Sequence, residues 1–276
     1  MELRYTPDIE RYPRLTANEL RAGYLVQNLF QPGTMHLVYT DVDRAIIGGI
    51  VPTTQKLLLG TSKELASSFF AERREIGVIN IGGKGAITVD SKEFALAKRD
   101  CLYIGRGSKQ LEFSSMNPQE PAWFYLVSYP AHVTHPTRLA TVADAEPVAL
   151  GTQRDANQRT IRKYIHGGGI PSCQLVMGFT ELKEGSIWNT MPPHTHARRS
   201  EIYLYFDLPV DAAVFHFMGS APETRHLVVR NGEAVLSPPW SIHCGAGTRH
   251  YCFIWAMGGE NQEFTDMDQI AVDALK

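Results

Sequence analysis

Residues 193–201 read Pro-His-Thr-His-Ala-Arg-Arg-Ser-Glu, and the alternation of His194 and His196 predicts a β-strand with both imidazoles on one face. Glu201 lies at odd parity to the two histidines. It can join their face only if residues 197–200 interrupt the strand through a turn or bulge. The short polar sequence Ala-Arg-Arg-Ser is compatible with such an interruption. A second strand is therefore expected to begin at Glu201 and to return its carboxylate to the pocket that the histidines face.

A third histidine, His243, follows the sequence Gly-x5-Pro-x-Trp-x-x and adds one more imidazole. Three imidazoles and one carboxylate suit zinc, iron, manganese or nickel, with positions left for a substrate. A single histidine in a strand is usually a hydrogen-bonded core or surface residue, so the prediction depends on the conjunction of four side chains. We predict that one divalent metal per chain is bound by His194, His196, Glu201 and His243.

The order and spacing of these residues resemble the double motif of the cupin superfamily. The longer run from Asn189 to Asp207 is more specific, because it resembles the signature of the 4-deoxy-L-threo-5-hexosulose-uronate ketol-isomerase family, also called 5-keto-4-deoxyuronate isomerases. The similarity extends over nearly the whole chain, including the opening Arg-Tyr-Thr-Pro segment and residues 102–107. Trp240 departs from the general cupin pattern, in which many members have glycine, and this departure bears on the shape of that turn.

Short segments rich in valine, isoleucine, phenylalanine and tyrosine alternate with turn-forming residues along most of the chain. This pattern predicts a mainly all-β fold, a bicupin of two jelly-roll β-barrels with a few short helices. With 276 residues and 43% hydrophobic content, the chain can bury a substantial core. We expect a degenerate cupin barrel over residues 1–140 and a metal-binding cupin barrel over residues 141–276, with a linker rich in proline, aspartate and glycine between about 130 and 169.

One of these helices is expected in the N-terminal domain. The sequence Thr16-Ala-Asn-Glu19 is typical of a capping box, and Leu15 and Leu20 are spaced as a hydrophobic staple. These signals predict a helix that continues to about Leu29, before a Pro-Gly pair.

A weak internal repeat favours two barrels. Residues 73–76 read Arg-Arg-Glu-Ile and echo residues 198–202, while Gln110 stands in the place of His243. No His-x-His precedes Glu75, and an amide binds first-row metals poorly compared with imidazole. We therefore predict that the first barrel is metal-free and supports the second.

The composition and the absence of other motifs disfavour several classes of protein. A formal net charge of -2 gives no electrostatic case for binding nucleic acid or a membrane surface. The four cysteines show no Cys-x-x-Cys spacing, and neither a signal peptide nor a membrane-spanning run is evident, so we expect reduced thiols and a cytoplasmic protein. The absence of a P-loop, a dinucleotide fingerprint and a nucleophile elbow disfavours nucleotide-dependent and serine-hydrolase activities.

The resemblance implies an enzyme, an isomerase that interconverts an aldose and a ketose. The substrate would be the small-molecule uronate 4-deoxy-L-threo-5-hexosulose uronate, and the product 3-deoxy-D-glycero-2,5-hexodiulosonate, during breakdown of unsaturated uronates from pectin. The resemblance also implies zinc and a homohexamer. A divalent metal supplies Lewis acidity without redox change, which suits the movement of a proton from C2 to C1.

A uronate carries a carboxylate, for which the planar guanidinium of arginine is a fitting partner. Arg198 and Arg199 lie beside the ligands in the sequence, and together with Tyr203 and His216 they are our candidate substrate-binding residues. A single arginine is more often a solvated surface charge. The catalytic base is left unassigned. Two further arginine candidates are Arg225 and Arg249.

Three other functions remain open. Another cupin sugar-acid isomerase, such as 5-deoxyglucuronate isomerase, shares the Pro-Pro-His-x-His type of segment and is separated by substrate assays. A cupin dioxygenase would need ferrous iron and consume oxygen. A non-enzymatic sugar-binding cupin would bind uronates without turnover.

Overall fold

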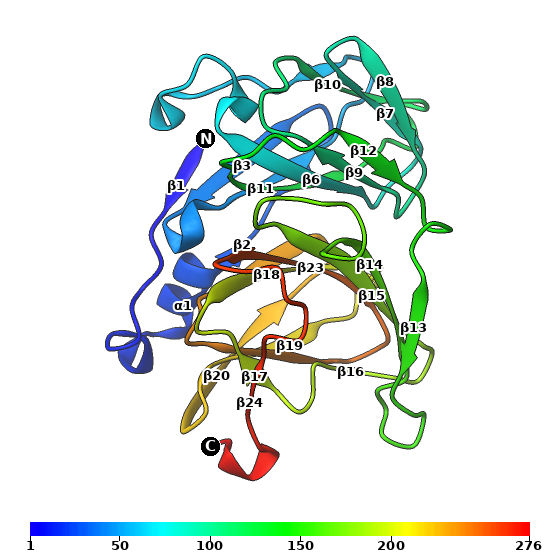
Figure 1. Cartoon of the computed structure of the whole chain (residues 1–276). Coiled ribbons are helices and arrows are strands. Elements are labelled where there is room, and N and C mark those ends of the chain that lie inside the picture. The colour runs from blue at the N-terminus through cyan, green and yellow to red at the C-terminus, as the bar shows by residue number, and fades with distance from the viewer. The chain divides into compact units, whose positions relative to one another are not determined.

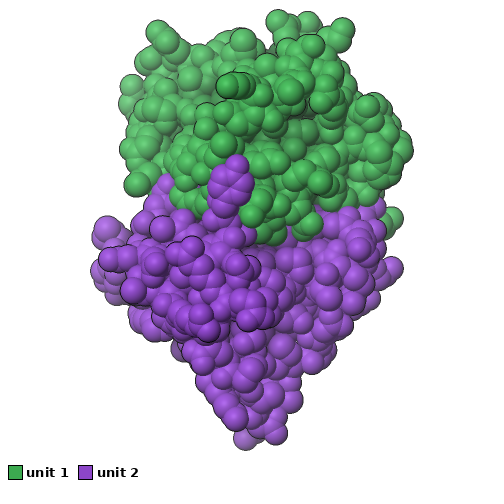
Figure 2. Space-filling model, turned by 90° about the vertical axis from the view of Figure 1, so that its left-hand side faces the viewer, with its two compact units in different colours: residues 1–4, 28–146, 164–176 green, residues 5–27, 147–163, 177–276 purple.

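The computed structural model describes all of residues 1–276, which form two compact units (Figures 1 and 2). Figure 2 colours unit 1 green and unit 2 purple. Unit 1 consists of residues 1–4, 28–146 and 164–176, and unit 2 of residues 5–27, 147–163 and 177–276. None of the helices combines the length and the apolar sequence that a membrane-spanning helix needs.

Unit 1 contains a seven-stranded sheet in the order β1-β3-β4-β11-β6-β9-β12 and a four-stranded sheet in the order β5-β10-β7-β8. The pairs are antiparallel except β1 with β3. Apolar side chains of both sheets meet in one core, which includes Ile87, Phe113 and Phe124. The strands of the larger sheet are β1 (Glu2–Arg4), β3 (Met35–Thr40), β4 (Ile46–Ile50), β6 (Arg74–Asn80), β9 (Cys101–Ile104), β11 (Phe124–Pro130) and β12 (Arg138–Ala140). Those of the smaller sheet are β5 (Leu57–Leu58), β7 (Gly85–Val89), β8 (Lys92–Leu96) and β10 (Leu111–Ser115).

A second seven-stranded sheet and a second four-stranded sheet repeat this arrangement, in the orders β13-β14-β15-β23-β18-β21-β2 and β16-β22-β19-β20. A further two-stranded sheet consists of β17 and β24. The strands of the seven-stranded sheet are β2 (Leu25–Val26), β13 (Pro147–Leu150), β14 (Arg159–Ile165), β15 (Val176–Leu182), β18 (Arg199–Phe206), β21 (Glu233–Ser237) and β23 (Cys252–Gly259). The remaining strands are β16 (Trp188–Asn189), β17 (His194–Thr195), β19 (Val214–Ser220), β20 (Glu223–Val229), β22 (Ile242–Gly247) and β24 (Asp268–Gln269).

The weak sequence repeat corresponds to a repeat in topology. Strand β6 lies between β11 and β9, just as β18 lies between β23 and β21. Both β6 and β18 are buried along their whole length. The sequence echo between residues 73–76 and 198–202 therefore marks the same central strand in two related sheets.

The carboxylate of Glu75, the counterpart of Glu201 in the repeat, accepts hydrogen bonds from other residues of unit 1. Its buried carboxylate accepts hydrogen bonds from the backbone N–H groups of Cys173 (2.7 Å), Gln174 (2.9 Å) and Leu175 (2.9 Å). The hydroxyl of Tyr103 donates a fourth hydrogen bond at 2.9 Å. In unit 1 this carboxylate fixes a loop, and the absence of a metal there stays a prediction.

The N-terminal helix differs from its prediction in extent and in position. Helix α1 (Ala17–Tyr24) begins with the predicted capping box, since Glu19 N donates to Thr16 Oγ1 at 3.3 Å and Thr16 N donates to Glu19 Oε2 at 2.8 Å. It ends five residues before the predicted Leu29, because the next residues form β2 and pair with β21.

The helix also belongs to unit 2, whereas we expected it in the N-terminal domain. Its Leu20 and Tyr24 are buried, and Arg21 Nη1 donates to Val228 O at 3.0 Å. Trp240, which departs from the cupin pattern, lies edge-on to Tyr12 at 5.3 Å and to Tyr24 at 6.4 Å between ring centroids. The tryptophan thus packs the turn that precedes His243 against the N-terminal segment. The 3-10 helices are η1 (Tyr12–Arg14), η2 (Val42–Arg44), η3 (Lys63–Leu65), η4 (Phe70–Glu72) and η5 (Val272–Ala274).

Candidate metal centre and its cavity

The chain is interrupted between the two histidines and Glu201, as the parity of Glu201 requires, and of the two histidines only His194 lies within a strand. Strand β17 ends at Thr195, and the chain turns before β18 starts at Arg199. Arg199 N donates to His196 O at 3.1 Å and closes this turn. Glu201 then lies between Ser237 of β21 and Met257 of β23.

The four predicted ligands come together in one buried cluster, which we call the metal cluster. His194 Nε2 lies 3.0 Å from His196 Nε2 and 3.0 Å from His243 Nε2. Glu201 Oε2 lies 3.1 Å from His196 Nε2 and 2.8 Å from His243 Nε2. All four side chains are buried, and their ligand atoms lie within 4.8 Å of one another. These four residues could hold a metal.

The hydrogen bonds around the histidines test whether a cation fits this cluster. His196 Nδ1 lies 2.6 Å from the carbonyl oxygen of Asp266, which can only accept, so the ring proton sits on Nδ1. In His243, Nδ1 lies 3.2 Å from Ser237 Oγ and 3.4 Å from Ser241 O, which assigns the same tautomer. In the neutral form of both rings, the Nε2 lone pairs face the Glu201 carboxylate and would repel it. A cation between these atoms, either a metal ion or a ring proton on Nε2, offsets that repulsion.

The spacing of the ligand atoms also fits a metal. Metal–ligand bonds of about 2.1 Å separate neighbouring ligand atoms by about 3.4 Å in a tetrahedron and about 3.0 Å in an octahedron. The four contacts span 2.8–3.1 Å. The cluster is therefore as compact as four neighbouring ligands of a six-coordinate ion.

The ionisation of the cluster agrees with this assignment. Burial, with a further contribution from the neighbouring His243, lowers the pKa of His194 to about 3, so its imidazole stays neutral at pH 7. Burial alone would raise the pKa of Glu201, but His243 and His196 outweigh it and hold that pKa well below its usual range. Neutral imidazoles and an ionised carboxylate are the forms that bind a divalent metal.

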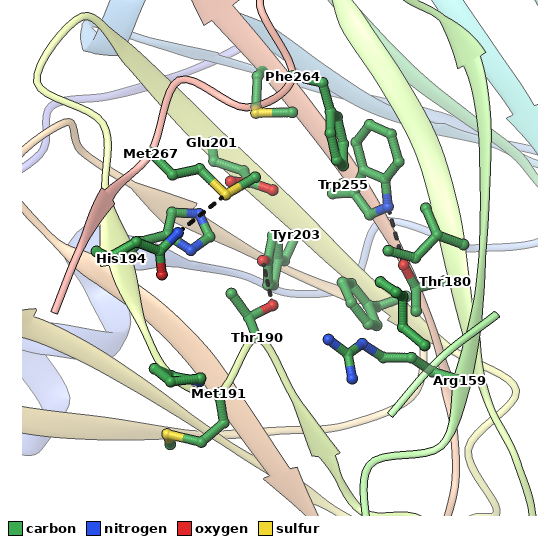
Figure 3. Close-up of a pocket in the computed structure, with 16 residues that line it drawn as sticks. Arg159, Thr180, Thr190, Met191, His194, Glu201, Tyr203, Trp255, Phe264 and Met267 are labelled. Atoms are coloured by element: carbon green, nitrogen blue, oxygen red, sulfur yellow. Dashed lines mark hydrogen bonds between the residues drawn. The ribbon is translucent and has the colours of Figure 1, made fainter. Parts of the chain in front are cut away.

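A cavity of about 280 Å³ opens beside the metal cluster (Figure 3). This volume lies just below the range of about 300–1,000 Å³ for small-molecule sites. The apolar part of the wall consists of Leu150, Ile161, Met191, Pro192, Phe253, Trp255, Met257, Phe264 and Met267. The polar part consists of Arg159, Thr180, Thr190, His194, Glu201, Tyr203 and Gln269.

Tyr203 is the predicted substrate-binding residue that lines this cavity. Its hydroxyl lies 3.0 Å from Thr190 Oγ1 (Figure 3). Burial, followed by the charge of Glu201, raises its pKa well above the usual value, so the phenol stays protonated. It can therefore donate a hydrogen bond to an oxygen of a ligand.

The two arginines beside the ligands do not line the cavity and instead bind the chain itself. The half-buried Arg198 forms ion pairs with Asp266 and Asp268. Arg199, which is 1% exposed, donates from Nη1 to Glu263 O at 2.6 Å and from Nη2 to Asp266 O at 3.1 Å. These contacts support a structural role for both arginines, and their contact with substrate stays a prediction.

The other candidates also lie outside the cavity wall. Arg225 Nη2 donates to Leu15 O at 2.9 Å, and Arg249 forms an exposed ion pair with Asp211 at 3.0 Å. His216 is fully buried, with Nδ1 2.8 Å from the Tyr205 hydroxyl and no partner for Nε2. The sequence-based reasoning missed Arg159 and Thr190, both of which line the cavity.

His216 gives the stability of the protein a pH dependence. Burial lowers its pKa from 6.5 to about 3, so the unfolded chain takes up a proton between these values and the folded chain does not. The stabilising contribution is complete above pH 6.5 and is lost as the pH falls toward 3. Between pH 6 and 4, the unfolding free energy of the wild type should fall more steeply than that of His216→Gln by about 1.4 kcal/mol per pH unit. Denaturant titrations of both proteins measure this difference, and parallel pH profiles would contradict it.

Comparison with known proteins gives consistent matches. The model of the KduI/IolB family matches residues 25–274. A 4-deoxy-L-threo-5-hexosulose-uronate ketol-isomerase from Shouchella clausii is 53% identical over 276 residues, covering 100% of both chains. A protein of the same name from Dickeya dadantii is 46% identical over 278 residues, again covering 100% of both chains.

Solved structures share the fold. An IolB-like protein from Salmonella typhimurium matches with a TM-score of 0.72 at 12% identity, over 90% of this chain and 96% of that chain. Oxalate decarboxylase from Bacillus subtilis, a protein with Mn(II) centres, matches with a TM-score of 0.55 at 10% identity, over 79% of this chain and 69% of that chain. The predicted all-β bicupin fold is confirmed.

Proposed function

Because the chain belongs to the KduI/IolB family and is an isomerase, we propose that it converts 4-deoxy-L-threo-5-hexosulose uronate to 3-deoxy-D-glycero-2,5-hexodiulosonate. The observation that carries the proposal is that His194 and Glu201 belong to the metal cluster and also line the cavity. A small molecule in this cavity would reach the cluster directly. Zinc as the metal, a homohexameric assembly and a place in pectin breakdown belong to the same proposal and rest on family resemblance.

In this proposal His194, His196, Glu201 and His243 hold one divalent metal, which supplies Lewis acidity when bound. The hydroxyls of Tyr203 and Thr190 face the cavity from one wall and orient the oxygens of the substrate. The apolar part of the wall excludes water. In the absence of water, the hydrogen bonds from Tyr203 and Thr190 to the substrate are stronger, and side reactions of the aldehyde are limited.

The reaction moves hydrogen from C2 to C1 of the aldose without a change in overall oxidation state. It therefore needs no nucleotide and no oxygen. When a base transfers this hydrogen as a proton, part of it exchanges with solvent during the transfer.

The test is an NMR experiment on the metal-loaded protein in deuterated buffer. We expect the aldehyde signal of the 5-keto-4-deoxyuronate to disappear under anaerobic conditions without nucleotide, and some deuterium to appear at C1 of the product. Metal content is measured on the same sample. Complete retention of the C2 hydrogen would indicate a hydride shift or a shielded proton.

The same experiment separates the competing functions. Strict dependence on oxygen would assign the protein to the dioxygenases. Turnover of 5-deoxyglucuronate alone would identify the other sugar-acid isomerase. Binding of uronates to the metal-loaded protein without turnover of either substrate would instead indicate a sugar-binding cupin.

A further inference from the structure

Arg159, the first residue of β14, is the only arginine or lysine that lines the cavity beside the metal cluster. Its Nη1 donates to Asn157 O at 2.9 Å, which leaves Nε and Nη2 without a partner in the chain. No carboxylate of the chain pairs with it. Figure 3 shows the guanidinium directed toward the part of the cavity where Thr190 and Tyr203 lie.

The surroundings of Arg159 make an unpaired charge unfavourable. Leu150, Ile161, Phe253 and Trp255 contribute apolar surface to the same cavity. Burial lowers the pKa of Arg159, although a guanidinium still remains charged at neutral pH. A partly buried cation without an anion is stabilised when a ligand brings one.

The acidic residue of the cavity wall cannot serve as that anion. Glu201 is engaged with His196 and His243, and in Figure 3 it lies with His194 on the side of the view away from Arg159. The cavity therefore presents two separate polar regions. One is the metal cluster, and the other is a cation with unused donors.

We propose that Arg159 binds the carboxylate of the uronate and so selects acidic sugars. The inference rests on the proposed function, which places the reacting carbons beside the metal cluster. In a six-carbon uronate the carbonyl end at C1 and the carboxylate at C6 are at opposite ends of the chain. A substrate with C1 and C2 at the cluster thus presents its carboxylate to a cation elsewhere in the cavity.

The chemistry of the guanidinium suits this task. Its planar donors bind both oxygens of a carboxylate, and such charge-assisted hydrogen bonds are stronger in an apolar cavity than in water. Thr190 and Tyr203 lie between the two regions in Figure 3 and can contact the intervening hydroxyl oxygens. A neutral hexose would leave the guanidinium unpaired, so it should bind more weakly.

The test compares Arg159→Gln and Arg159→Lys with wild type and with Arg249→Gln as a matched control. Arg249 is an exposed arginine of the same unit that pairs with Asp211 and does not line the cavity. Each protein is assayed for kcat/KM with the 5-keto-4-deoxyuronate, for metal content and for Tm. Competition by D-galacturonate and by D-galactose measures whether the carboxylate contributes to affinity.

We expect Arg159→Gln to lower kcat/KM by roughly 10²- to 10³-fold while metal content and Tm stay at wild-type values. Arg159→Lys should recover part of this loss, because it keeps the charge but not the planar fork. The preference for galacturonate over galactose should disappear in Arg159→Gln and persist in Arg249→Gln.

A kcat/KM of Arg159→Gln within threefold of wild type, with the preference for galacturonate intact, would overturn the inference and leave the isomerase assignment standing. Wild-type protein without turnover would instead overturn the proposed function. In that case, a preference for galacturonate that Arg159→Gln abolishes would still assign the carboxylate site to Arg159.

Discussion

Replacement of His196 and His243 together by alanine should abolish metal binding and lower turnover by roughly 10³-fold or more. The variant keeps only His194 and Glu201 of the metal cluster, and two ligands cannot hold the ion in the buried site. The fold should persist, because both large sheets of unit 2 have buried apolar residues of their own. Elemental analysis, turnover and circular dichroism measure the three expectations.

The matched control is the double variant His226→Ala, His250→Ala, in which two exposed histidines of the same unit are removed. It should keep its metal and its activity. Full metal occupancy in the His196→Ala, His243→Ala variant would contradict the assignment of the ligands. Loss of activity with the metal retained would indicate a direct role of these histidines in the reaction.

The fold was predictable from sequence where local signals and long-range pairing agree. The capping box at Thr16 and Glu19 forms as expected, because its two hydrogen bonds involve residues three apart. The end of the helix was not predictable in the same way. Leu25 and Val26 follow the helix and pair with β21, which lies more than 200 residues later in the chain. No local sequence pattern predicts that pairing.

The metal cluster was predictable because three of its four residues lie within eight positions of one another. The residues of the cavity wall were not predictable in the same way. Arg159 lies 35 residues before His194, on a strand that reaches the site only through the order of the sheet. Arg159 and Ile161 both line the cavity. Their spacing of two predicts that they share one side of β14, but it does not predict what that side contacts.

Proximity in sequence to the metal cluster does not place Arg198 and Arg199 in the cavity wall. Their partners belong to residues 263–268. The motif around the histidines does not predict that this distant segment lies beside it. Arg199 donates to carbonyl oxygens of this segment, and one of them, Asp266 O, also accepts from His196 Nδ1. Arg199 is thereby linked through a shared carbonyl to a residue of the metal cluster.

Replacement of Arg199 by methionine should therefore destabilise the protein and weaken its metal site together. The change removes charged donors from the carbonyls of Glu263, Phe264 and Asp266 in a site that is 1% exposed. We expect a loss of about 3 kcal/mol in the free energy of unfolding. Because Asp266 O orients His196, metal affinity should also fall about 10- to 100-fold. Denaturant titration and metal competition measure the two effects.

Arg198→Gln is the matched control, since it removes the neighbouring arginine, whose ion pairs with Asp266 and Asp268 are more exposed. Exposed ion pairs contribute little to stability, so this variant should unfold close to wild type. The carbonyl of Asp266 stays bound to Arg199 in this variant, so metal affinity should change little. If Arg198→Gln and Arg199→Met lowered metal affinity equally, the loss would follow from positive charge near the site. A loss confined to Arg199→Met would follow from the shared carbonyl that holds His196 in its metal-binding tautomer.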